Sequence, residues 1–341
     1  MRVLLFQIDG KLPNLALMAI AAHHRQRGDD VALRHVRRPE NVERDLFDEP
    51  DKVYASCIFE RSRPVAARLK EVYPGAIIGG TGWDHRTNLK DHGIDSTRHD
   101  YTDYPGFRQS MGFSQRGCRF DCSFCKVPQA EGKVRDVCSI AELWRGEPWP
   151  RELLLLDNDF FGSPTWREKI KQIRDGGFKV SFNQGINARV LSEEAAEAIA
   201  SVDYCSDDMK NRWIYTAWDS KEDEHVLFRG LERLTKYGVK PDSIIVYMLI
   251  GYWAGETEAD WLYRQQRLRD FGARPYPMPY VRKGPPLWFQ RWCIRRGDVG
   301  KNKATWEEYK RVYGRPEKLG PREERLALPL FADCNGTPLA L

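Results

Sequence analysis

Residues 243–272 read SIIVYMLIGYWAGETEADWLYRQQRLRDFG. The apolar run Ser243–Ile250 predicts a buried strand. Glu256–Phe271 has the spacing of a helix, and Gly272, which follows it, is a residue that commonly ends helices. A buried strand followed by a helix is the repeating unit of parallel α/β folds. This stretch therefore predicts an α/β fold.

The same alternation extends toward the N-terminus. Further strands are predicted at 152–156, 180–182 and 213–217, and further helices at 166–174, 192–200 and 222–237. Repeated strand–helix units of this length build a whole or partial TIM-type barrel. Functional sites of such barrels lie at the carboxyl ends of the strands.

Residues 1–100 form a separate alternating pattern. Strands are expected at 2–8, 31–35, 53–59 and 76–78, with helices at 15–27 and 64–72. This predicts a Rossmann-like parallel sheet with helices on both faces. The fourth strand ends in Gly79-Gly80-Thr81-Gly82, but the full G-x-G-x-x-G phosphate fingerprint is absent. We therefore expect a plain turn there and no dinucleotide site.

The expected domains are residues 1–100, 101–285 and 286–341. Residues 101–112 read as a linker, and Gly284-Pro285-Pro286 breaks the helical and strand pattern. The last segment is basic and rich in aromatic residues, which are Trp288, Trp292, Trp306 and Tyr309. Such a segment can bind phosphates and stack on bases. It can equally pack over the mouth of the barrel.

Composition sets broad limits. The chain has 341 residues, of which 41% are hydrophobic and 30% charged, as in a soluble globular protein. Its net charge of +5 permits a polyanionic partner without requiring one. The longest strongly apolar run, Ile244–Ile250, is too short for a membrane span, and no secretory signal is evident. The expected location is cytoplasmic, without a membrane partner.

Three of the eight cysteines are clustered as Cys118-x3-Cys122-x2-Cys125. Thiolates at such spacing suit an iron–sulfur cluster or zinc. Three thiolates leave one iron of a cubane open for another ligand, since ordinary electron-transfer clusters use four cysteines. Zinc with Cys138 or a histidine as fourth ligand, and buried cysteines without metal, are the alternatives.

With the aromatic Phe124 before its last cysteine, this C-x3-C-x-Φ-C motif resembles the signature of the radical S-adenosylmethionine (radical SAM) superfamily. The resemblance covers about residues 110–285 and implies that this part of the chain is a partial (β/α)6 TIM-type barrel. It implies that Cys118, Cys122 and Cys125 hold a [4Fe–4S] cluster whose open iron binds SAM. An electron from a flavodoxin- or ferredoxin-type donor then cleaves SAM to a 5′-deoxyadenosyl radical, which abstracts hydrogen from the substrate.

The resemblance also assigns cofactor contacts. Asp157, Asn158 and Asp159 stand where the family often has Gly-Gly-Glu, which binds the methionine amino group; a helix cap or turn is the alternative. Asn183, Gln184 and Arg189 are expected at the ribose or carboxylate, and otherwise form a polar turn with a surface ion pair. Gly251 is expected to let the adenine approach, or to serve only as a turn. Phe124 is the remaining residue that is expected to contact the cofactor.

Two expectations concern other segments. Cys205 is a candidate hydrogen donor, although a buried structural cysteine is the ordinary interpretation. Residues 1–100 resemble the cobalamin-binding domain that precedes many radical SAM domains. No D-x-H-x-x-G occurs in the sequence, so we expect a degenerate domain with a structural or substrate-capping role; cobalamin bound without a histidine ligand is the alternative.

The leading hypothesis is a radical SAM enzyme that modifies a nucleic-acid base or a nucleotide-like substrate, so nucleic acid is a candidate partner. One alternative is a radical SAM enzyme, an isomerase or other, that acts on a small molecule, an amino-acid-like group or a peptide. A non-catalytic zinc or iron–sulfur module is the other. The reaction outcome does not follow from the sequence.

Overall fold

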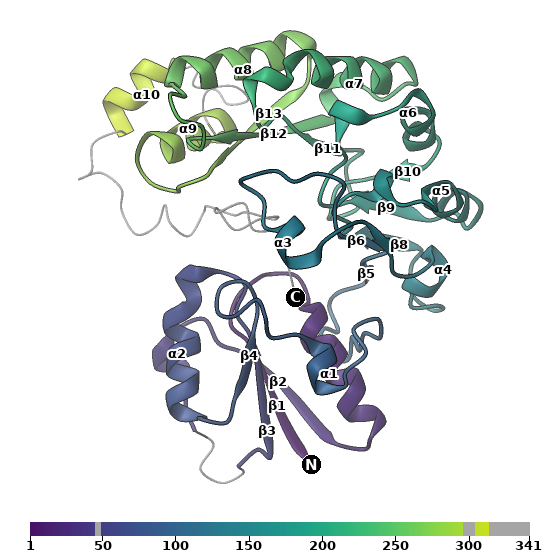
Figure 1. The fold of residues 1–341 in the computed structure, drawn as a ribbon, viewed down its shortest axis with the longest axis vertical. Coiled ribbons are helices and arrows are strands. Elements are labelled where there is room, and N and C mark those ends of the chain that lie inside the picture. The colour runs from purple at the N-terminus through teal and green to yellow at the C-terminus, as the bar shows by residue number, and fades with distance from the viewer. Residues whose placement is uncertain (45–48, 296–303, 314–341) are drawn as a thin grey trace. The chain divides into compact units, whose positions relative to one another are not determined.

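The computed structural model describes residues 1–44, 49–295 and 304–313 (Figure 1). It divides into two compact units. The first is Met1–Arg108, and the second comprises the described residues from Gln109 onward. Both units contain parallel sheets flanked by helices, which confirms the predicted α/β class. In the described part of the chain, no helix has the length and apolar character needed to cross a bilayer.

The first unit is built on one parallel sheet. Its strands are β1 (Arg2–Gln7), β2 (Asp30–His35), β3 (Lys52–Ser56) and β4 (Ile77–Gly79), in the order β2-β1-β3-β4. Helix α1 (Leu15–Gln26) and helix α2 (Arg63–Val72) lie on opposite sides of this sheet (Figure 1). The strands and helices agree with those predicted for residues 1–100.

Alternation along the strands explains these two layers. Val3 and Leu5 pack with Leu17 of α1, whereas Leu4 and Phe6 pack with Leu69 of α2. Successive side chains of a strand point to opposite faces, so a strand that is apolar throughout is covered on both sides.

The glycine run after β4 serves close backbone packing. Gly80 has φ +106°, and a Cβ there would lie 2.3 Å from the carbonyl oxygen of Cys57. The Gly82 N–H donates to that carbonyl at 3.0 Å, and the Thr81 hydroxyl donates to the carbonyl of Ile58 at 2.7 Å. These contacts hold the loop after β4 against the loop after β3, as expected for a turn.

The second unit contains two parallel sheets. The first has the order β10-β9-β8-β5, and the second has the order β11-β12-β13. Their strands are β5 (Ser110–Gly112), β8 (Glu152–Leu155), β9 (Lys179–Phe182), β10 (Asp203–Tyr204), β11 (Ile214–Ala217), β12 (Ile244–Ile250) and β13 (Arg274–Pro279). The short strands β6 (Gln115–Arg116) and β7 (Arg135–Asp136) form an antiparallel pair.

The two sheets meet beside β9 and β11. The Ile186 N–H donates to the carbonyl of Tyr215 at 2.8 Å, and the Ala188 N–H donates to the Thr216 hydroxyl at 3.2 Å. Helices α5 (Trp166–Asp175), α6 (Glu193–Ala200), α7 (Glu224–Lys236) and α8 (Glu258–Phe271) follow one another along one side of the strands (Figure 1). One continuous apolar core lies between these helices and the strands. The remaining short helices are α3 (Val127–Glu131) and α4 (Ile140–Leu143).

Among the elements of the second unit that differ from the prediction are two strands and one helix. Strand β5 lies inside the segment 101–112 that was expected to be a linker. Strand β13 was missed because it contains three prolines; it pairs only with β12, and an edge strand tolerates prolines because one of its sides needs no N–H donors. Gly284-Pro285-Pro286 does not interrupt the structure but opens helix α9 (Gly284–Arg295), where proline suits the first turn.

The aromatic residues of the C-terminal segment are part of the core. Phe289, Trp292, Trp306 and Tyr309 are buried in the same apolar cluster as the strands, through α9 and helix α10 (Trp306–Tyr313). These four rings pack inside the core, so they are not available to stack on bases, whereas the predicted Trp288 is only partly buried against the same cluster. Packing over a barrel mouth stays a prediction. Its expected basic residues Arg296, Lys301 and Lys303 lie outside the described residues.

Candidate functional site

The clustered cysteines lie on a loop, residues 117–126, between β6 and α3; we call it the cysteine loop. Gly117 has φ +76°, and a Cβ there would lie 2.2 Å from the Lys133 carbonyl oxygen. The Cys118 N–H donates to the Gly132 carbonyl at 3.2 Å, and the Cys125 N–H donates to the Cys122 carbonyl at 2.9 Å. The loop therefore begins where its backbone packs closely against residues 132–133, and it ends in a tight turn.

The thiols of Cys118, Cys122 and Cys125 are half-buried and free of disulfides. Burial raises the pKa of each, that of Cys125 to about 11. The charge of Cys122 contributes to the raised pKa values of both other thiols, so the three lie within electrostatic reach of one another. A hydrogen bond from Arg189 acts in the opposite direction and lowers the pKa of Cys122.

The donor set fits a thiolate-bound iron–sulfur cluster, because three unpaired soft ligands share one short loop. Among the described residues, no group of three or more His, Cys, Asp or Glu side chains already has the arrangement of a metal site.

Asp157 directly follows β8 and is almost fully buried. Its carboxylate accepts hydrogen bonds from the N–H groups of Ser114 and Gln115, at 2.7 and 3.1 Å, and from the Ser114 hydroxyl. Burial raises the pKa of Asp157 to about 6. This carboxylate joins the end of β8 to the segment that follows β5 and leads into the cysteine loop.

Asn158 and Asp159 contact the cysteine loop and its flanks. Asp159 accepts two hydrogen bonds from the Arg119 guanidinium, at 2.7 and 2.9 Å, and the Asn158 amide donates to Glu131 at 2.7 Å. Glu131 in turn accepts from the Gly117 N–H. In the free chain this polar run therefore fixes the cysteine loop, and its contact with a cofactor stays a prediction.

The second predicted group follows β9. Asn183 is fully buried, and neither atom of its side-chain amide has a hydrogen-bond partner in the structure. Gln184 is half-buried. Arg189 pairs with Asp223 at 2.7 Å and also lies over the ring of Phe120 in the cysteine loop, 5.5 Å from its centroid. Arg189 therefore forms the ion pair that was the alternative to cofactor binding. This ion pair lies beside the cysteine loop.

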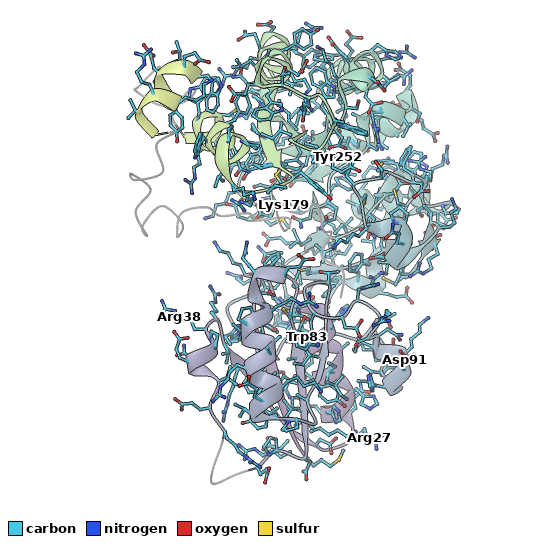
Figure 2. All side chains as sticks on the ribbon, turned by 60° about the vertical axis from the view of Figure 1, so that its left-hand side comes forward. Arg27, Arg38, Trp83, Asp91, Lys179 and Tyr252 are labelled. Atoms are coloured by element: carbon cyan, nitrogen blue, oxygen red, sulfur yellow. The ribbon has the colours of Figure 1, made fainter. Side chains whose placement is uncertain are left out.

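The third group follows β12. The Phe124 ring contacts Tyr252 and Trp253, with centroid distances of 5.6 and 6.4 Å; Figure 2 labels Tyr252. Gly251 has φ +74°, and its N–H donates to Glu256 at 2.6 Å. These contacts bring the end of β12 to the cysteine loop.

A buried arginine holds the turn that follows β12. Arg264 of α8 donates to Glu256, to the Trp218 carbonyl at 3.0 Å and to the Leu249 carbonyl at 2.8 Å. Its guanidinium thus joins the ends of β11 and β12 to the turn that carries Tyr252 and Trp253. The turn whose aromatic residues contact Phe124 is therefore held in place by a buried salt bridge.

Asp219, which the sequence analysis missed, lies just after β11. Burial raises its pKa to about 6, and its charge acts on Cys122 and Cys125. Its backbone carbonyl accepts a hydrogen bond from the Trp253 indole at 2.7 Å. The signal that could have identified it is the one used for Asp157, a carboxylate just past the end of a buried strand.

Cys205 occupies a different place from the other cysteines. Its charged neighbours include Glu152 and Lys179, which are the first residues of β8 and β9, and burial raises its pKa to about 12. Figure 2 labels Lys179. The cysteine loop instead contacts residues beyond the carboxyl ends of these strands. Cys205 also acts electrostatically on Tyr215 of β11, so its role as a hydrogen donor stays a prediction.

Residues beyond β8, β9, β11 and β12 thus converge on one cysteine-bearing loop, with cations, carboxylates and aromatic rings around it. No family model matches the sequence, and no curated protein matches it either. The chemistry of this site must therefore be argued from its residues.

Proposed function

We propose that the chain is a radical SAM enzyme and that Cys118, Cys122 and Cys125 bind its [4Fe–4S] cluster. The observation that carries the proposal is the convergence of four strand ends on the cysteine loop, through Asp159, Arg189, Asp219 and Trp253. A cofactor bound at the loop would face groups from all four strand ends. Sites of parallel α/β proteins lie at this edge.

The two parallel sheets of the second unit would then form one partial barrel. The hydrogen bonds from Ile186 and Ala188 to β11 support this arrangement, because they join the two sheets beside β9. The buried helix-facing core supports it too, since one apolar cluster runs beneath both sheets.

The chain's own residues have distinct roles in this proposal. When bound, the cluster would supply one electron to the sulfonium of SAM and so yield a 5′-deoxyadenosyl radical. Arg189 offsets negative charge at the thiolate of Cys122. Arg119 and Asp159 fix the loop between the first two cysteines, and Phe124 with Trp253 covers it on the side of β12. Aromatic cover of this kind limits the access of water.

An external protein must deliver the electron, and we propose a flavodoxin- or ferredoxin-type donor. The substrate we propose is a nucleic-acid base or a nucleotide-like molecule. We do not propose cobalamin as a cofactor. In the first unit, which resembles a cobalamin-binding domain, the loop after β4 is held by contacts with its own chain.

The metal is tested by anaerobic incubation with iron and sulfide, followed by iron, sulfide and zinc analysis. We expect about four irons per chain, as a cubane requires. Cys118→Ala should lose most of this iron, and Cys138→Ala should retain it. Zinc in place of iron, or equal loss in the Cys138 variant, would contradict the proposal and favour a zinc module.

A further inference from the structure

The strands of the second unit have an inner face, which points away from the helix-covered core. On β9, Val180 and Phe182 belong to that core, so Ser181 and Asn183 lie on the inner face by alternation. On β11 and β12, Ile214 and Val246 belong to the core, which places Tyr215 and Tyr247 on the inner face. Tyr276 of β13 pairs in register with Tyr247.

Tyrosines line this face where a barrel interior usually holds branched aliphatic residues. The rings of Tyr215 and Tyr247 are parallel, with centroids 5.9 Å apart, and Tyr276 meets Tyr247 edge to face at 5.5 Å. Asp207, from the loop after β10, acts electrostatically on both Tyr215 and Tyr247. Asp208 also acts on Tyr215, so the face combines an aromatic wall with nearby carboxylates.

Two polar groups of β9 on this face have no partner. Both amide atoms of Asn183 and the hydroxyl of Ser181 are buried without a hydrogen bond in the structure, and both residues have an exposed fraction of 0%. A buried polar group without a partner destabilises the folded chain unless something satisfies it. The Asn183 amide offers a donor and an acceptor side by side, which suits a ligand edge of the complementary kind.

The charge on this face does not suit an anion. Its two cations, Lys179 and Arg274, are the first residues of their strands, and each donates to a backbone carbonyl, of Met209 at 2.7 Å and Asp242 at 2.6 Å. Asp207 instead favours a ligand group that donates hydrogen bonds. A neutral planar ligand with adjacent donors and acceptors meets these conditions.

We propose that the inner face of β9, β11, β12 and β13 binds a nucleobase that carries an exocyclic amino group. The ring stacks on the wall of Tyr215, Tyr247 and Tyr276, as bases do on aromatic side chains. The base edge pairs with the Asn183 amide, which matches adjacent donor and acceptor atoms. This inference rests on the proposed function, since such a base would be the substrate of the radical.

The test is calorimetric titration of the cluster-free, full-length chain with cytidine and uridine, which exchange an amino for a carbonyl group at one ring position and reverse the hydrogen-bonding sense of the ring nitrogen beside it. We expect cytidine to bind at least about 10-fold more tightly, because the Asp207 carboxylate near this face accepts a hydrogen bond from an amino group and repels a carbonyl oxygen. Adenosine and inosine give a second matched pair. Asn183→Ala and Tyr247→Leu should each weaken binding, and Tyr263→Leu, on the outer helix α8, should not.

Several results would overturn the inference: no nucleoside binds, the amino and carbonyl nucleosides bind equally, or the Asn183 and Tyr247 variants bind as well as the parent. Adenosine binding that SAM blocks and that Tyr247→Leu leaves unchanged would also overturn it, by assigning the base to the cofactor. Iron binding and SAM cleavage test the proposed function separately. If the chain cleaves SAM but binds no nucleoside, this inference is wrong and the proposed function stands.

Discussion

The first and second units both place polar side chains just beyond the carboxyl ends of parallel strands, but they use them differently. In the first unit, Asp9 accepts the N–H groups of Ile58 and Phe59 at 2.9 Å each, and Tyr104 donates to Gln7 at 2.7 Å. In the second unit, Asn183 follows its strand without a partner. No buried side-chain nitrogen or oxygen of the described residues in 1–108 lacks a partner in this way.

The comparison teaches that the same edge of the same kind of sheet can be closed by its own groups or kept for a ligand. Buried polar groups are normally satisfied within a protein, and exceptions gather at functional sites. The first unit has the sheet order of a ligand-binding fold, yet its loops bond to one another. Fold alone therefore does not assign a ligand to it.

The largest expected effect tests the close backbone packing of the loop after β4 in the first unit. Gly80→Ala places a Cβ 2.3 Å from the Cys57 carbonyl oxygen at a positive φ, so we expect a loss of roughly 4 kcal/mol or more in the free energy of unfolding. Gly28 also has a positive φ, but a Cβ there meets nothing within 4 Å. Gly28→Ala should cost only about 1–2 kcal/mol. Urea unfolding followed by circular dichroism measures both, and equal losses would contradict the role of close packing.

The second prediction concerns Asp157, whose carboxylate bonds to its own chain at the carboxyl ends of the strands in the second unit. Asp157→Ala leaves the N–H groups of Ser114 and Gln115 without their acceptor, so we expect a loss of about 3 kcal/mol in the free energy of unfolding. Asp157→Asn keeps an oxygen acceptor and should lose less. Thermal unfolding of the three proteins at pH 5 checks the order.

The pH dependence of stability in the parent and in Asp157→Asn tests the raised pKa of Asp157. Because burial raises the pKa of Asp157 from 3.8 to about 6, the folded state holds this proton more tightly than the unfolded state. Its contribution to stability is present below pH 4 and lost as the pH rises through 6. The parent should therefore lose up to about 3 kcal/mol relative to Asp157→Asn between pH 4 and pH 7. A constant difference would contradict the raised pKa.

A smaller effect compares two buried asparagines directly. Asn14 caps α1 through the Leu17 N–H and donates to the Ser56 hydroxyl at 2.8 Å, so Asn14→Ala should cost about 1–2 kcal/mol in the free energy of unfolding. Asn183 has no such bonds, and Asn183→Ala should leave the ligand-free chain equally or slightly more stable. Matched urea unfolding measures both. A larger loss for Asn183→Ala would mean that its amide is satisfied within the protein.

The smallest expected effect is that of Cys205→Ala. Because Cys205 neighbours the first residues of β8 and β9, we expect iron content and SAM cleavage to stay unchanged. Product analysis with the substrate, once it is known, checks the remaining possibility. A changed product in this variant would support Cys205 as a hydrogen donor.

Much of the fold followed from the sequence, because apolar runs and helical spacing report burial directly. The strands β1, β9 and β12 and the glycine end of α8 are where the pattern placed them. Strand β13 was missed because its prolines contradict strand propensity, and only its position at an edge allows them. Helix α9 was missed because the same residue type that breaks helices also starts them.

The site was predicted less completely. The cysteine spacing identified the loop, and the polar strand ends identified Asp159 and Arg189, which both contact it. Asp219 and Trp253 were missed because their relation to the loop arises from packing between distant strands. The unpartnered state of Asn183 depends on every neighbour around it, so no local pattern could show it.

The measurement that tests the central claim most directly is the formation of 5′-deoxyadenosine from SAM by the reconstituted, dithionite-reduced enzyme under anaerobic conditions. Cys118→Ala serves as the negative control and Cys138→Ala as the matched positive control. We predict 5′-deoxyadenosine from the parent and Cys138→Ala, and none from Cys118→Ala. A parent enzyme that binds iron and SAM but forms no 5′-deoxyadenosine, even with the nucleosides present, would contradict the account.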